Sequence, residues 1–258
     1  MSERPRLLHA ELHLYALASA AGVLLFLYPF VQALLTFCAY QLRSSGAVET
    51  ISLAINSVFI DDLYDITRRR LVAQRTIGGS SLAVLFLSAL VILRPVSIAL
   101  NRTWGPGPRR AFAIDILKAL LVFPCAVLFL ASAVLTLPDH GGALIALGSP
   151  TRSQTFSVVL VLELVALTLS TAAAYLIYWL VPDRRRAVVR TLPMALAAGL
   201  WLEGLKYAAL LFWKPLLQER MYRQYGTFYN AMTILVFGYF AALIILSVAR
   251  FSTRISKP

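Results

Sequence analysis

Charged residues are scarce in this sequence of 258 residues. Asp, Glu, Lys and Arg make up 14% of it, and hydrophobic residues make up 59%. Ordinary soluble domains carry roughly 25% charged residues. A soluble core could not bury this much apolar surface, which excludes an ordinary soluble protein. The two cysteines, Cys38 and Cys125, both lie in apolar stretches. We interpret them as packed thiols, and they indicate no redox compartment.

The sequence also lacks the patterns of known hydrolytic and nucleotide-binding sites. Metal hydrolysis needs clustered His, Cys or carboxylate ligands. There are three histidines, and the pair His9 and His13 in HAELH has no third ligand near it in the sequence. A Walker loop, GxSxG and GxGxxG are all missing. We therefore predict that the protein is not an enzyme and holds no metal or other cofactor.

What the sequence does contain is long apolar stretches. A spanning helix needs about 20 mostly apolar residues, and none of the stretches shows the two-residue alternation of a barrel wall. The sequence therefore predicts an all-α, polytopic membrane protein that forms a single membrane domain over residues 1–258. Its six transmembrane helices are predicted at about 14–40, 80–102, 112–137, 155–181, 191–213 and 228–249. Pro29, Pro95 and Pro124 fall inside three of them and predict kinks.

The basic residues gather mainly at the ends of the predicted helices. The formal net charge is +12, which we attribute to anionic lipid headgroups and the positive-inside rule and not to nucleic acid. With both termini inside, twelve of the 24 Lys and Arg residues lie in inner segments, nine in outer segments and three within spans. We therefore predict that both termini are cytoplasmic and that anionic headgroups bind the inner loops.

A further segment lies between the first and second spans. Over residues 47–75, apolar residues recur at helical spacing with polar residues between them, which predicts an amphipathic helix. Two interpretations stay open. The helix lies on the outer leaflet or on the bundle, or it caps an outward-facing cavity.

Several charged residues lie inside the predicted spans. One such charge at the bilayer centre costs from about 2.5 to over 10 kcal/mol, so it must face protein, water or a partner. Glu203 and Lys206 can pair on one helix face. They either hold helices in register or line a polar cavity, with Arg94 as an anion contact. Asp115 is the expected partner of Lys118. The candidates for a substrate path or cavity are Arg94, Asp115, Lys118, Glu163, Glu203 and Lys206.

Scattered motifs resemble a known family. They are LRPVSIALNRTW at 93–104, a short basic loop after Pro182, and Tyr225-Gly226 before the last span. The first motif contains Asn101 and Arg102 and is followed by Arg109 and Arg110. With the hydropathy pattern over roughly 14–250, these motifs resemble the YihY/BrkB family of bacterial inner-membrane proteins. The resemblance implies six spans with both ends cytoplasmic. Members have been labelled virulence or serum-resistance factors, transport-like proteins linked to envelope lipids and, formerly, ribonuclease BN.

Three functional hypotheses remain. In the first, the protein is transport-like or handles lipids or amphiphiles in the cell envelope, and an amphiphilic or anionic substrate passes through a polar cavity in the bundle. In the alternative, it is a non-transporting scaffold or assembly subunit. The small residues of ALAAG at 195–199 and the basic inner loops would then dock a protein partner or a second copy. An RNA-processing nuclease has the least support, because it needs a metal site that the sequence does not show.

Overall fold

The computed structural model is all-helical in the part of the chain that it describes. That part comprises residues 4–40, 79–104, 118, 120–135, 152–183, 188–209, 211–212, 218–226 and 228–255. The helices are α1 (Arg4–Tyr40), α4 (Gly79–Trp104), α6 (Val122–Leu135), α8 (Arg152–Leu180), α9 (Val188–Ala208), α10 (Gln218–Tyr225) and α11 (Phe228–Ile255). These residues include no strand, so the prediction of an all-α protein is confirmed. The predicted amphipathic segment at 47–75 lies outside them.

Four of the described helices are long and apolar enough to cross a membrane. The segments are Glu11–Leu34 in α1, Ala83–Trp104 in α4, Val159–Leu180 in α8 and Phe228–Ser252 in α11. They coincide with four of the six predicted spans. The predicted span at 112–137 contains α6, whose apolar part is shorter, Val122–Ala133. The predicted span at 191–213 overlaps α9, which carries three charged residues, Arg190, Glu203 and Lys206. Six spans therefore remain a prediction.

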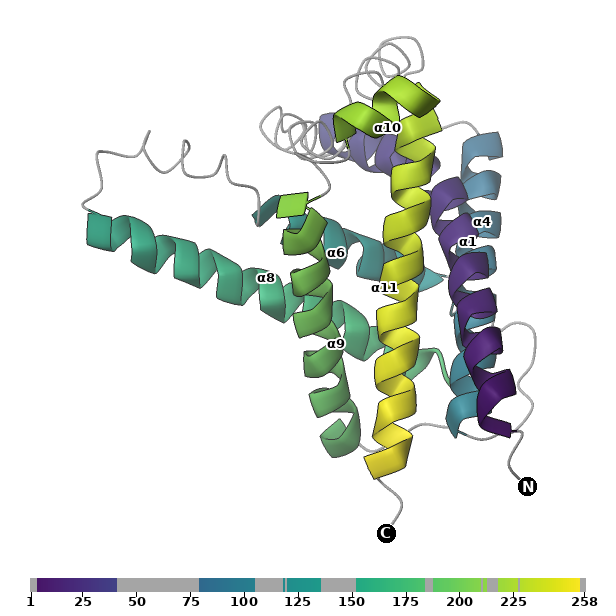
Figure 1. Cartoon of the computed structure of the whole chain (residues 1–258). Coiled ribbons are helices and arrows are strands. Elements are labelled where there is room, and N and C mark those ends of the chain that lie inside the picture. Colours follow the sequence, from purple (N-terminus) through teal and green to yellow (C-terminus); the bar gives the residue numbers. More distant parts are fainter. Residues whose placement is uncertain are drawn as a thin grey trace.

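The helices pack in two groups. One group contains α1, α4 and α11, and the other contains α6, α8 and α9, while α11 also contacts α9 and so joins the groups. Figure 1 shows that α8 is inclined to the other long helices and that its first half extends away from them. The start of α1 and the end of α11 lie at the same end of the bundle, and α10 lies at the opposite end (Figure 1). This arrangement is expected when the chain runs from one end of the bundle to the other an even number of times.

Glycines allow the closest helix contacts. A Cβ added to Gly22 of α1 would lie 2.9 Å from the backbone nitrogen of Ile92 in α4. A Cβ added to Gly199 of α9 would collide with Oγ1 of Thr171 in α8 and would lie 3.0 Å from its Cα. Larger side chains at these positions would force the helices apart, because backbone atoms leave no room for them.

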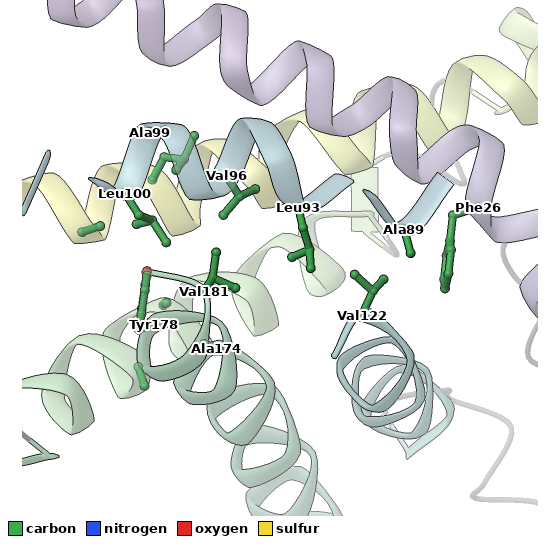
Figure 2. Packing of buried hydrophobic residues seen from close by; sticks show 14 of the residues in the cluster. Phe26, Ala89, Leu93, Val96, Ala99, Leu100, Val122, Ala174, Tyr178 and Val181 are labelled. Carbon is green, nitrogen blue, oxygen red and sulfur yellow. The ribbon is translucent and has the colours of Figure 1, made fainter. Parts of the chain in front are cut away.

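The apolar core lies where α4 meets α6 and the end of α8. Figure 2 shows Leu93, Val96 and Leu100 of α4 near Tyr178 and Val181. The Tyr178 hydroxyl donates a hydrogen bond of 2.7 Å to the carbonyl of Ile245 in α11. The end of α8 is thereby held against both α4 and α11, and this fixes the polar residues that follow it.

The prolines differ in their surroundings. Pro29 and Pro95 lie inside α1 and α4, which are each described as one helix. Leu121 forms a turn, in which its backbone N–H donates to the carbonyl of Lys118 at 2.9 Å, and α6 begins at Val122. Pro124 therefore lies in the first turn of a helix, where its missing N–H breaks no hydrogen bond. The predicted kinks remain predictions.

Candidate functional site

Charged side chains gather at two places in the described structure. The Glu203 cluster consists of Ser132, Ser170, Glu203 and Lys206, which come from α6, α8 and α9. The Asp183 cluster consists of Asn101, Lys118 and Asp183, and it lies where the chain leaves α8. Residues far apart in the sequence build both clusters.

The Glu203 cluster is centred on one carboxylate oxygen. Oε1 of Glu203 accepts hydrogen bonds from Lys206 Nζ at 2.7 Å, from Ser132 Oγ at 2.8 Å and from Ser170 Oγ at 2.5 Å. Lys206 also donates to Ser132, which itself lies 2.8 Å from the carbonyl of Ala166. The predicted pairing of Glu203 with Lys206 is therefore present, and the pair also ties three helices together.

The other carboxylate oxygen of Glu203 differs from the first. Glu203 is 6% exposed, and its Oε2 is buried without a hydrogen-bond partner. Oγ1 of Thr171, which follows Ser170 on α8, is also buried without a partner. Thr171 faces Gly199, which is one turn before Glu203 on α9. The interface between α8 and α9 thus contains two unsatisfied buried oxygens, which are uncommon in proteins.

A second carboxylate lies near this cluster. Glu163 of α8 is partly buried, accepts a hydrogen bond from the Tyr207 hydroxyl and acts electrostatically on Lys206. The ammonium of Lys206 also lies 5.6 Å from the centre of the Phe129 ring, within the range of a cation–π contact. Lys206 thus lies between two carboxylates, and it is hydrogen-bonded to Glu203.

The Glu203 cluster lies midway along a candidate span. Ser170 is 11 residues after Val159 and 10 residues before Leu180, the ends of the apolar segment of α8. Ten residues of helix correspond to about 15 Å. Since Ser170 binds Glu203 directly, the carboxylate lies at the same depth in the bundle.

The Asp183 cluster is a second polar junction. Asn101 Nδ2 donates to one carboxylate oxygen of Asp183 at 2.8 Å, and Lys118 Nζ donates to the other at 2.8 Å. In return, the backbone N–H of Asp183 donates to Oδ1 of Asn101 at 2.9 Å. The cluster fixes the turn after α8 to α4 and to the segment that precedes α6.

This junction gives Lys118 a partner that the sequence did not suggest, and it combines two motifs. The sequence suggested Asp115 as the partner of Lys118, which is 8% exposed, but the described carboxylate at 2.8 Å is Asp183. Asp115 lies outside the described residues. Two motif positions also meet here, because Asn101 binds Asp183 and the preceding Pro182 is fully buried. Sequence reasoning missed Asp183 because it lies 65 residues from Lys118.

Arg94 belongs to neither cluster. It lies 11 residues after Ala83 and 10 residues before Trp104, at the middle of the apolar segment of α4. Its side chain is exposed and has no ion pair or hydrogen bond with any residue that the structure describes. The structure therefore does not bring it to Glu203 and Lys206, whose charges pair with each other.

The remaining motif positions lie near the helix ends. Arg102 forms an exposed ion pair of 2.8 Å with Glu11 of α1. Gly226 has a φ of 54° and joins α10 to α11, and its N–H donates to the carbonyl of Tyr222 at 2.8 Å. This is the left-handed conformation that glycine adopts most readily. The adjacent Tyr225 is exposed. Arg109 and Arg110 lie outside the described residues.

One histidine of HAELH also has a partner. Nδ1 of His13 lies 2.6 Å from the hydroxyl of Tyr239 in α11. The contact joins α1 to α11. Among the residues that the structure describes, no group of three or more His, Cys, Asp or Glu could hold a metal ion.

Comparison with known proteins gives one finding. A family model described as virulence factor BrkB matches residues 4–257, which is nearly the whole chain. No curated protein and no solved structure matches the chain. The extent of the family match agrees with the apolar helices, which are typical of a multi-pass membrane protein. The chain belongs to the virulence factor BrkB family.

Proposed function

We propose that this protein moves an anionic amphiphile, such as a phospholipid, between the leaflets of the bacterial inner membrane, and that both of its termini are cytoplasmic. The observation that carries the proposal is Arg94 at the middle of the α4 span, which is exposed and has no partner among the described residues. The Glu203 cluster carries less weight here because its two principal charges pair with each other.

The surroundings of Arg94 make its charge costly. Leu87, Val91 and Ile98 are exposed and recur with Arg94 at intervals of three and four residues, so all four share one face of α4. Apolar side chains on such a face suit lipid chains. An arginine at the bilayer centre costs at least about 2.5 kcal/mol. A helix that retains this arginine needs a compensating anion or water at the same depth.

A lipid phosphate meets this requirement. Guanidinium groups bind phosphate oxygens through paired charge-assisted hydrogen bonds. The acyl chains of the same molecule would pack along the apolar face, beside Leu87 and Val91. A headgroup reaches the middle of the bilayer only while the lipid passes between leaflets. We therefore assign to Arg94 the role of lowering the free energy of that passage.

The proposal is tested with the full-length protein in liposomes that contain fluorescent NBD-phosphatidylglycerol. Dithionite, which does not cross the bilayer, bleaches only outer-leaflet label, so translocation appears as additional loss of fluorescence. We expect the wild type to translocate the lipid and Arg94→Gln to slow translocation about ten- to hundredfold, because a charge-assisted hydrogen bond contributes about 1.5–3 kcal/mol. Arg94→Lys should retain much of the rate.

The matched control is Arg220→Gln, which removes an exposed positive charge from α10, outside the apolar segments. It should translocate the lipid at the wild-type rate. If Arg94→Gln equals the wild type, the assigned path is wrong. If wild-type liposomes bleach no further than protein-free liposomes, the transport proposal itself fails.

The alternative role as a scaffold has less support. The proposed docking face at 195–199 is largely occupied within the chain, because Ala195 and Ala198 are fully buried and Gly199 packs against Thr171 of α8. A stoichiometric protein partner that co-purifies with a translocation-inactive wild type would favour the scaffold.

A further inference from the structure

Glu203 accepts hydrogen bonds through one of its two carboxylate oxygens and none through the other. Oε1 accepts three hydrogen bonds, whereas Oε2 is buried and accepts none. The residue is more than nine-tenths buried, so bulk water does not satisfy Oε2. A buried carboxylate oxygen without a donor is costly. The site is complete only when something that Oε2 can bind is present.

Among the described residues, the charges around this oxygen leave an excess of one negative charge. The elements that pack around Glu203 are α6, α8 and α9, with α11 against α9. α6 has no charged residue, and the charges of α11 lie in its last two turns, beyond Ala249. Apart from the arginines near the starts of α8 and α9, the charged residues are Glu163, Glu203 and Lys206. Two carboxylates and one ammonium sum to a charge of about −1 when all are ionised.

Two other ionisable side chains on these helices, Tyr207 and Cys125, are uncharged hydrogen-bond donors. The Tyr207 hydroxyl donates to Glu163. The Cys125 thiol of α6 donates to the carbonyl of Ala173, 3.8 Å away, and does not contact Glu203. A single positive charge would therefore neutralise the buried group.

The geometry favours a proton over a metal ion. Hard cations need several oxygen ligands around them. Among the described residues, the buried side-chain oxygens without a partner are Oε2 of Glu203 and Oγ1 of Thr171. A metal ion there would have too few ligands. A proton needs one lone pair, and Oε2 supplies it.

We propose that Glu203 is a proton-binding site and that its protonation changes the partner of Lys206. A proton from solvent forms an O–H bond at Oε2, no other covalent bond changes, and the three charged residues Glu163, Glu203 and Lys206 go from a summed charge of about −1 to neutral. The ion pair between Glu203 and Lys206 then becomes a contact between a carboxylic acid and an ammonium. Glu163 is the remaining carboxylate near Lys206, and the ammonium turns toward it.

This step would loosen the junction of three helices. Ser132 of α6 and Ser170 of α8 both bind the ionised Oε1 of Glu203. Hydrogen bonds to a carboxylate are stronger than those to a neutral acid. Proton binding therefore weakens the contacts that join α9 to α6 and α8. This inference does not depend on lipid transport, because it rests on a different cluster from Arg94.

The test is infrared difference spectroscopy of the full-length protein in liposomes, recorded between about pH 9 and about pH 6, where exposed glutamates stay ionised because their pKa is about 4.3. Protonation of Glu203 should produce the carbonyl band of one carboxylic acid. Carbon-13 labelling of glutamate should shift this band in the wild type, which assigns it to glutamate without any substitution. Glu203→Gln should abolish the band, and the matched variant Glu163→Gln should retain it.

Three outcomes would overturn the inference. They are the absence of a glutamic acid band in the labelled wild type, its persistence in Glu203→Gln, and its loss in Glu163→Gln. If Glu203→Gln does not fold, the labelled wild type and Glu163→Gln still decide the question, because Glu163 and Glu203 are the glutamates near Lys206 among the described residues. The Arg94 assay is independent, so a failure of lipid transport leaves this result unaffected.

Discussion

Two ion pairs of equal length near the same end of α4 should differ widely in their effect on stability. Asp183 pairs with Lys118 at 2.8 Å, and the two side chains are 24% and 8% exposed. Glu11 pairs with Arg102 at 2.8 Å, and those side chains are 38% and 53% exposed. We predict that Asp183→Ala destabilises the protein substantially and that Glu11→Ala does not.

The magnitude follows from the bonds that each substitution removes. Asp183→Ala removes the charge-assisted hydrogen bonds from Lys118 and Asn101. At about 1.5–3 kcal/mol each, reduced because water reaches part of Asp183, the loss is about 2–4 kcal/mol. The turn after α8 then keeps only the backbone N–H bond of residue 183 to Asn101 from this cluster. Glu11→Ala removes a pair that water and salt already screen, so no measurable change is expected.

Thermal unfolding of the two variants in one detergent measures the difference. A loss of 1 kcal/mol lowers the Tm by about 2–4 °C for a chain of this size. Asp183→Ala should therefore lower the Tm by about 4–16 °C, and Glu11→Ala should match the wild type within error. Equal shifts for the two variants would refute the assignment of stability to burial, as would a wild-type Tm for Asp183→Ala.

Two further predictions concern α9. Gly199→Ala should destabilise the protein by about 1–3 kcal/mol because its Cβ would meet backbone atoms of Thr171. Gly204→Ala, where an added Cβ meets nothing within 4 Å, should stabilise α9 by up to about 1 kcal/mol. The same Tm assay compares them, and equal signs would contradict the packing. Lys206→Leu should cost about 3–5 kcal/mol, whereas adding Glu203→Leu should restore most of that loss. A double variant less stable than Lys206→Leu would contradict this account.

The helices were predictable because hydropathy is a local property. The apolar segments of α1, α4, α8 and α11 coincide with predicted spans. The pairing of Glu203 with Lys206 was also readable, because residues three apart on a helix lie on one face. The pairing of Lys118 with Asp183 was not readable. The expected partner, Asp115, is three residues from Lys118, whereas Asp183 is brought to Lys118 by the packing of α6 against α8.

The hydroxyl groups of the Glu203 cluster could not be identified from the sequence. Serines in apolar helices often bond to their own backbone. Ser19 and Ser88 do so, with hydrogen bonds of 2.8 Å to the carbonyls of Tyr15 and Val84. Ser132 and Ser170 have similar apolar neighbours in the sequence but bond to Glu203 on another helix. Whether a serine bonds to its own backbone or to another helix depends on how its helix is rotated about its axis. Tertiary packing sets that rotation.

The sequence suggested one polar path for Arg94, Glu203 and Lys206, and the structure separates these residues by their surroundings. Glu203 and Lys206 lie among α6, α8 and α9, where a charge is retained because other polar groups surround it. Arg94 lies on the exposed face of α4, where none of the described residues pairs with it. Packing explains how Glu203 and Lys206 are retained inside the bundle, except for the unpaired Oε2 of Glu203. Packing does not explain the exposed Arg94, whereas the anion binding that we propose does. A path for an anionic amphiphile is therefore better placed along the outside of α4 than through the centre of the bundle.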